Sequence, residues 1–290
     1  MITEQFQFYA ARSVKESVDL LKQFDGDAKL LAGGQSLVPL MNLGLVAPAC
    51  IIDITKILDL SYTRDDGDCV TIGALTPHHI IAGSTLIQQN CAMLVDAASH
   101  IGDLQVRHRG TISGAVCHAD PAGDYSPVLV AAGAEFQLTS SEGVRMAKAQ
   151  DFFQDVFTTD LKPTEMLTSI RIPKPRGRSA SSYQKLEFIT GGFAIAGVAA
   201  LLTVDGAGKC QGLCVVIGAV ETKPILLSGV EAELVGKPLD EAAMAKAGNA
   251  ASEAVTNPLS DIHADGDYRR AMAGVLTRRA LKAALGRLKP

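Results

Sequence analysis

Residues 31–39 read LAGGQSLVP, and this stretch decides how the first part of the chain folds. The apolar run at 29–32 predicts a buried strand that ends at Gly33 and Gly34, and residues 36–45 predict a helical turn. Because glycine has no Cβ, the main chain of this loop stays open to a close neighbour or a ligand. Free N–H groups there, together with the start of the turn, suit a phosphate. A plain tight turn without a ligand is the alternative.

Helix and strand patterns alternate around this loop. Ser13 and Glu16 form a capping-box pair, and the apolar residues that follow recur at helical spacing, so residues 13–23 predict an amphipathic helix. The other elements predicted in this part are a strand at 49–54, a strand at 70–74, a helix whose first residues are 76–82, and a hairpin formed by 135–138 and 144–147. Strand, glycine loop, short helix and strand in this order indicate α/β-type organisation near the start of the chain.

A linker and a second lobe are predicted further along the chain. Residues 173–182, PKPRGRSASS, combine Pro, Gly, Ser and charge without an apolar period, which favours a linker and a domain boundary. After it, the apolar runs 194–204 and 210–220 flank Asp-Gly-Ala-Gly at 205–208 and predict a hairpin. Helices are predicted at 239–254 and 268–288, so we expect lobes of about 170 and about 110 residues.

Basic residues crowd the last predicted helix and predict a solvated basic face, with a docking surface for an acidic partner as the alternative. They are Arg269, Arg270, Arg278, Arg279, Lys282, Arg287 and Lys289.

Composition excludes several classes of protein. The 290 residues carry a net charge of -4, which gives no general attraction for nucleic acid or an anionic membrane. The longest apolar stretch, residues 193–202, is far shorter than the roughly 20 residues that cross a bilayer. Residues 1–9 lack a secretory signal pattern, so we expect a cytoplasmic protein. The six scattered cysteines predict free, mostly buried thiols, and Cys210 and Cys214 are expected on one strand face.

A second small-residue segment, residues 109–124, reads RGTISGAVCHADPAGD. Its hydroxyls and glycines can again face a phosphate, and Asp124 can accept hydrogen bonds from ribose or amine groups. Because residues 111–132 show no clean period, we expect a functional loop with short helices there rather than a core element. Two such loops suit a dinucleotide whose pyrophosphate lies between them.

Familiar nucleotide and metal motifs are absent or weak. The sequence has neither G-x-G-x-x-G after a strand nor G-x-x-x-x-G-K-[ST], which excludes a Rossmann fingerprint and a P-loop. His108, His118 and Asp120 are an alternative metal cluster, but they lie in the second segment or directly before it, and we predict no metal site. His78 and His79 predict a surface pair.

Three stretches carry a resemblance to a known family: LAGGQSLVPLM (31–41), RGTISGAVCHADPAGD (109–124) and DIHADGDYRRAMAGVLTRRAL (261–281). They resemble the FAD-binding medium subunit of the molybdenum hydroxylases, the group that contains bacterial carbon monoxide dehydrogenase and xanthine dehydrogenase. The resemblance implies an α+β fold. Residues 1–175 form an FAD-binding domain of the vanillyl-alcohol oxidase type, in two subdomains split near 55–60. Residues 176–290 form a C-terminal α+β lobe with a small antiparallel sheet and helices.

The resemblance also implies the cofactor-binding residues. The main chain of residues 32–36 holds the FAD pyrophosphate with help from the second segment, Asp124 contacts the adenosine part, and Phe193 helps to cover the flavin. The full implied set is Leu31, Ala32, Gly33, Gly34, Gln35, Ser36, Leu37, Ile101, Thr111, Ser113, Gly114, Ala115, Asp124, Leu167, Lys185 and Phe193. Two positions depart from the family, since Gly192 stands where many relatives have an acid and Ser113 where they have glycine.

The implied function is electron transfer within a complex. FAD is expected to be noncovalent, because the loop Gly-Gly-Gln-Ser offers no His or Cys tether. The expected partners are a small [2Fe-2S] subunit and a large molybdopterin-cofactor subunit in a dimer of heterotrimers. Electrons would pass from the clusters to this subunit and then to an external acceptor. We predict no catalytic residue in this chain and no hydroxylation by it alone. The alternatives are a free-standing FAD-dependent oxidoreductase with its own small-molecule substrate, and a scaffold without flavin.

Overall fold

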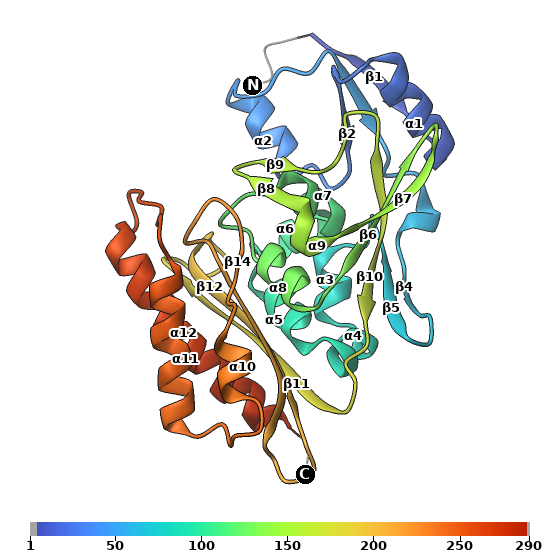
Figure 1. The fold of residues 1–290 in the computed structure, drawn as a ribbon. Helices are drawn as coiled ribbons and strands as arrows, with labels where there is room; N and C mark the ends of the chain where they lie inside the picture. The colour runs from blue at the N-terminus through green and yellow to red at the C-terminus, as the bar shows by residue number, and fades with distance from the viewer. Residues whose placement is uncertain (1–4, 289–290) are drawn as a thin grey trace.

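The computed structural model describes residues 5–288, and its first sheet is small and parallel (Figure 1). The strands lie in the order β1-β3-β2, with β1 at Gln7–Ala10, β2 at Ala28–Leu31 and β3 at Cys50–Asp53. Helix α1 (Val14–Gln23) and helix α2 (Leu37–Asn42) connect them. Ser13 caps α1 by accepting the N–H of Glu16 at 3.1 Å, as predicted.

The second sheet is antiparallel, in the order β4-β5-β10-β6-β7, and carries most of the helices on its flank (Figure 1). Its strands are β4 (Thr63–Asp65), β5 (Cys69–Gly73), β10 (Met166–Pro173), β6 (Glu135–Ser140) and β7 (Gly143–Lys148). The helices are η1 (Leu58–Leu60), α3 (His78–Ala82), α4 (Thr85–Asn90), α5 (Ala92–His100), α6 (Leu104–Arg109), α7 (Ile112–His118), α8 (Tyr125–Ala131) and α9 (Ala149–Phe152). A separate hairpin joins β8 (Phe153–Asp155) and β9 (Thr158–Thr159).

The third sheet is antiparallel and covered on both faces. Its strands are β11 (Arg178–Glu187), β12 (Ala194–Val204), β13 (Cys210–Gly218) and β14 (Ile225–Leu226). Figure 1 shows α10 (Val230–Leu234), α11 (Glu241–Ala254) and α12 (Gly266–Arg287) on one side, while α5 and α8 contact the other. Val198 and Ala200 enter the core under α12, whereas Ala199 enters the core shared with α5 and α8. Burial of both faces explains why β12 and β13 are nearly continuous apolar runs.

The predicted linker is shorter than expected. Strand β11 begins at Arg178, so only residues 174–177 connect β10 with β11. Ser181 and Ser182 are buried, and Ser181 Oγ accepts the N–H of Met93 at 3.2 Å. These small residues let α5 pack closely on the strand, which is why the segment lacks the large apolar residues that usually reveal a strand.

Residues 111–132 contain short helices, as expected, but the expectation that no core element lies there is wrong for α8. Every residue of α8 is buried, and the helix packs against β12 and β13 of the third sheet and against the helices α5, α7 and α9. A Cβ added to Gly218 would come within 2.7 Å of Pro127 Cγ, so helix and strand are in very close contact. A helix buried on all sides shows no apolar stripe, and its sequence therefore has no helical period.

The expected common face of two cysteines on β13 is also wrong. Cys210 lies in the core under α12, whereas Cys214 packs against the core shared with α5 and α8. A bulge shifts the register of β12 and β13 between Thr203 and Val204. The extra residue reverses the side-chain alternation, so positions four apart point to opposite faces.

Arg269 contradicts the predicted solvated basic face. It is 3% exposed, and its Nη1 donates to the carbonyl oxygens of Ile195 at 2.6 Å and Ala219 at 2.9 Å. Its Nη2 pairs with Asp261 Oδ2 at 2.6 Å. Arg269 therefore joins three segments of the C-terminal lobe. Arg278 and Arg279 are exposed as predicted, and Lys289 lies outside the described residues.

Replacing Arg269 with Met should destabilise the fold by about 3 kcal/mol, because two buried carbonyl groups lose their donors. Urea unfolding monitored by circular dichroism measures this. Arg279→Met on the same helix is the control and should change the free energy of unfolding by less than about 0.5 kcal/mol. Equal stabilities of the two variants would contradict the structural role of Arg269.

The predicted surface histidine pair is wrong for His78. This side chain is buried, its Nδ1 hydrogen-bonds with the hydroxyl of Tyr125 at 2.9 Å, and its ring leaves no room for a Cβ on Gly110. Burial, with the positive charge of Arg107, lowers the pKa of His78 to about 4. His78 is therefore neutral near pH 7 and supports the turn at Gly110.

The pH dependence of stability should reflect His78. Below pH 6.5 this histidine is protonated in the unfolded chain, whereas in the native state it stays neutral until the pH falls to about 4. Stability should therefore fall as the pH is lowered through this window, by up to about 3 kcal/mol from His78 alone. Urea unfolding across the window should give a smaller decline for His78→Gln than for the wild type. Parallel declines would contradict the assignment.

Candidate functional site

The loop between β2 and α2 carries main-chain donors that the protein leaves unused. Within residues 5–288, the N–H groups of residues 33–37 have no acceptor. Ser36 makes no capping bond with its side chain, and the Gln35 amide donates back to the carbonyl of Gly33 at 3.3 Å. Gly34 has a φ of +72°, a conformation that glycine adopts without strain. The loop therefore presents five consecutive donors to a ligand.

The second segment lies directly against this loop. A Cβ on Gly33 would overlap the carbonyl oxygen of Arg109 and come within 2.7 Å of Gly110 Cα. Thr111 follows immediately and caps α7, where its Oγ1 accepts the N–H of Gly114 at 3.2 Å. The structure thus brings the two predicted phosphate segments into main-chain contact, although they are far apart in the sequence.

The two segments differ in the donors that they can offer. The N–H of Ser113 is already bonded to the carbonyl of Ala74 at 3.2 Å, and that of Gly114 to Thr111. Gly114 is exposed and Ala115 half-buried at the start of α7. Most uncommitted main-chain donors therefore come from the first loop, while the second segment contributes the N–H of Thr111 and the exposed surface of Gly114.

Ser113, which departs from the glycine of the family, fits without strain. It lies in helix α7 and is buried, and it does not have a positive φ. A right-handed helical residue accommodates a Cβ, so serine at this position leaves the backbone geometry intact.

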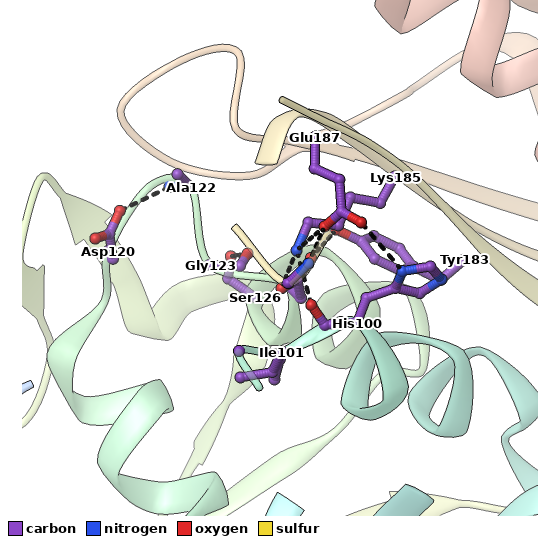
Figure 2. A network of polar contacts seen from close by, with 12 residues as sticks. His100, Ile101, Asp120, Ala122, Gly123, Ser126, Tyr183, Lys185 and Glu187 are labelled. Atoms are coloured by element: carbon purple, nitrogen blue, oxygen red, sulfur yellow. Dashed lines mark hydrogen bonds and ion pairs between the residues drawn. The ribbon is translucent and has the colours of Figure 1, made fainter. Parts of the chain in front are cut away.

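Asp124 and Lys185 form the centre of a buried polar network (Figure 2). The Lys185 side chain is fully buried, and its Nζ contacts Asp124 Oδ2 at 3.0 Å, Glu187 Oε2 at 3.2 Å and the carbonyl oxygen of His100 at 3.2 Å. The hydroxyl of Tyr183 donates to the other Asp124 oxygen, Oδ1, at 2.8 Å. The network joins the second segment to β11 of the C-terminal lobe.

Burial and charge oppose each other in this network. Burial raises the pKa of Asp124, while the ammonium of Lys185 and its hydrogen bonds lower it. Burial and the nearby carboxylate raise the pKa of Tyr183 well above its ordinary value, so its hydroxyl stays protonated and donates. A buried carboxylate with two good donors can stay ionised, as the ion pair with Lys185 requires.

Hydrogen bonds of Gly191 hold the loop at residues 188–193 beside Ile101. Gly191 accepts the N–H of Gly102 at 3.0 Å through its carbonyl, and its own N–H donates to Glu187 Oε2 at 3.2 Å. A Cβ on Gly191 would overlap the carbonyl oxygen of Gly102. Phe193 lies at the end of this loop and is 70% exposed, as expected of a side chain that awaits a partner surface.

Two predicted contact residues lie deeper in the fold. Leu31 ends β2 and is half-buried in register with Asp53, while Leu167 is 3% exposed within β10. Leu167 precedes a bulge between β10 and β6, and its side chain belongs to the core of the second sheet. The proximity of Leu167 to the flavin stays a prediction.

His108, His118 and Asp120 do not form a metal-binding cluster in the part of the chain that is described. No group of three metal-binding side chains comes together there. His118 stacks on Phe157 at 4.9 Å between ring centroids, and Asp120 accepts the N–H of Ala122. None of the helices described is long and apolar enough to span a bilayer.

Sequence reasoning missed three members of the polar network: His100, Tyr183 and Glu187. Tyr183, Lys185 and Glu187 are two residues apart on one strand, so they share a face. The alternation of these polar residues was a usable signal, but the apparent linker composition at 173–182 concealed the strand that carries them.

Two family models together match nearly the whole chain. Residues 4–175 match the model described as the FAD binding domain in molybdopterin dehydrogenase. Residues 181–284 match the CO dehydrogenase flavoprotein C-terminal domain.

Known proteins resemble the chain over its full length. It is 37% identical to the carbon monoxide dehydrogenase medium chain of Afipia carboxidovorans, covering 100% of both chains. It is 35% identical to the glyceraldehyde dehydrogenase medium chain of Sulfolobus acidocaldarius, covering 97% of this chain and 99% of the other. The structure of carbon monoxide dehydrogenase from Hydrogenophaga pseudoflava, in a form lacking the Mo-pyranopterin moiety, matches with a TM-score of 0.95, 37% identity and complete coverage of both chains. The chain therefore belongs to the family of FAD-binding medium chains of molybdenum-containing dehydrogenases.

Proposed function

We propose that this chain holds FAD noncovalently, with the diphosphate at the junction of the two loops. The observation that carries the proposal is the run of N–H groups at residues 33–37, which lack acceptors in the described chain. Half-buried main-chain donors are seldom left unbonded, and converging amides bind phosphate oxygens. The first loop would contribute Leu31, Ala32, Gly33, Gly34, Gln35, Ser36 and Leu37, and the second segment Thr111, Ser113, Gly114 and Ala115.

The remaining contacts are those that the family resemblance implies. Asp124 would accept hydrogen bonds from the adenosine part, and Ile101 would pack on the cofactor. Leu167, Lys185 and Phe193 would lie toward the flavin. Neither His nor Cys occurs in residues 31–37, which supports noncovalent binding.

The proposed role is that of an electron-transfer subunit. The chain receives electrons from [2Fe-2S] clusters of a small partner subunit and delivers them to an external acceptor. A large subunit with the molybdenum cofactor carries out substrate hydroxylation, and the assembly is a dimer of heterotrimers. Bound FAD supplies the redox chemistry, since a flavin exchanges electrons singly or in pairs. The relatives named as medium chains of dehydrogenases support this role.

Two organisational proposals accompany this function. The FAD-binding domain spans residues 1–175 and the C-terminal domain residues 176–290, of which 1–4 and 289–290 lie outside the described part. The location is cytoplasmic, which the six free cysteines favour.

Anaerobic rapid mixing of the purified complex with the substrate of its large subunit tests the function. The visible flavin absorption should bleach after the clusters are reduced, and omission of the small subunit should abolish the bleaching. The isolated chain should carry flavin but turn over no small donor. Turnover by the isolated chain would instead favour a free-standing oxidoreductase, and a complex without flavin would overturn the proposal.

Replacing Gly33 with Ala should reduce FAD affinity by roughly 5- to 150-fold, because the added Cβ forces the two loops apart, at a cost of about 1–3 kcal/mol. The ratio of flavin to protein and a fluorescence titration of the deflavinated chain with FAD measure this. Gly206→Ala is the matched control, since a Cβ there meets nothing within 4 Å. Equal affinities in the two variants would contradict the loop assignment.

A further inference from the structure

Three alternate residues of β11 share one face and point toward the second segment (Figure 2). Their register partners on β12 are small: Tyr183 faces Ala199, Lys185 faces Gly197, and Glu187 faces Ala194. A Cβ on Gly197 would overlap the Tyr183 hydroxyl. The space that Tyr183 occupies therefore depends on glycine in the neighbouring strand.

The position of the Lys185 ammonium is fully determined by its surroundings. An ammonium group has three donors. Lys185 meets Asp124, Glu187 and the main-chain carbonyl of His100, all within 3.2 Å. With the side chain fully buried, no donor is left to rotate toward water. Glu187 also accepts the N–H of Gly191, so the same carboxylate holds the loop that carries Phe193.

Two side chains of the C-terminal lobe likewise fix the position of the Asp124 carboxylate. Asp124 is 6% exposed, and its two oxygens receive Tyr183 and Lys185, one each. Without the Tyr183 hydroxyl, the buried carboxylate would keep one donor and would be less able to stay ionised.

We propose that Tyr183 and Glu187 are positioning residues that hold Asp124 and Lys185 in one fixed, charged arrangement at the cofactor. This inference rests on the proposed FAD site, which includes Asp124 and Lys185, and it gives the C-terminal lobe a direct part in FAD binding. Neither Tyr183 nor Glu187 needs to touch the cofactor for this role.

The two positioning residues have opposite electrostatic effects on Asp124. The Tyr183 hydroxyl stabilises the ionised carboxylate, whereas Glu187 adds a second negative charge near it and competes for Lys185. The other titratable groups near Asp124 are His100 and Tyr125. Because the ionised form of Asp124 makes the ion pair with Lys185 and is the stronger acceptor for the adenosine part, FAD affinity should fall as pH is lowered through the pKa of Asp124.

Fluorescence titration of the full-length, deflavinated chain with FAD over a range of pH tests the inference. Tyr183→Phe removes a donor from the carboxylate, so affinity should fall at a higher pH than in the wild type. In the acidic range it should be weaker by about tenfold, the usual effect of one hydrogen bond to a charged group. Glu187→Gln keeps the size of the side chain but removes its charge, so its profile should shift to lower pH.

Thr277→Val is the matched control. It also loses a buried hydroxyl, but that hydroxyl donates to the carbonyl oxygen of Ala273 within α12 rather than to a carboxylate. Its stability should fall, while its affinity profile should coincide with that of the wild type. A purely structural role of Tyr183 predicts the wild-type affinity profile for both variants and would overturn the inference.

The outcomes separate this inference from the proposed function. A wild-type chain that binds no FAD overturns both. A wild-type chain that binds FAD, with both β11 variants unchanged or shifted in the same direction, overturns only the positioning role. If Tyr183→Phe does not fold, Glu187→Gln decides: a shift to lower pH supports the role, and an unchanged profile overturns it.

Discussion

The contact between Gly33 and the main chain of Arg109 and Gly110 is the constraint on which the site depends. It joins a loop of the parallel sheet to a helix start that belongs to the second sheet. On the far side of the contact, the ring of His78 fills the space that a side chain on Gly110 would need. Three layers therefore lie in direct contact, and the distance between the two loops has almost no freedom. Within residues 5–288, the five main-chain amides of residues 33–37 beside this junction have no acceptor.

Much of the fold could be predicted because its signals are local. The capping pair at Ser13 and Glu16 and the Asp-Gly-Ala-Gly turn between β12 and β13 each act over a few residues, and the structure confirms both. The misjudged features depend on distant neighbours. Helix α8 shows no helical period because the third sheet covers one side of it and the helices α5, α7 and α9 cover the others. Arg269 is buried because its guanidinium donates to two carbonyl groups from other segments.

The candidate site shows the same division. The two glycine-bearing segments could be found from the sequence, since glycine pairs and hydroxyl-rich stretches are visible without a structure. The network behind them could not, because His100, Asp124 and Tyr183 come from three separate parts of the chain. The roles of the individual cofactor-binding residues remain predictions that rest on the resemblance and on this geometry. Of the two departures from the family seen in the sequence, Ser113 is harmless because the helix accommodates it.

The core that α8 shares with the third sheet has a consequence for how this protein could have evolved. Two family models divide the chain near residue 180, yet Tyr183, Ala199 and Val216 belong to the same core as residues of α8. A gene fragment that ended at the division would leave α8 facing water along one side. A recombinant of two relatives would therefore have to exchange both parts together or recreate the matching surface of each.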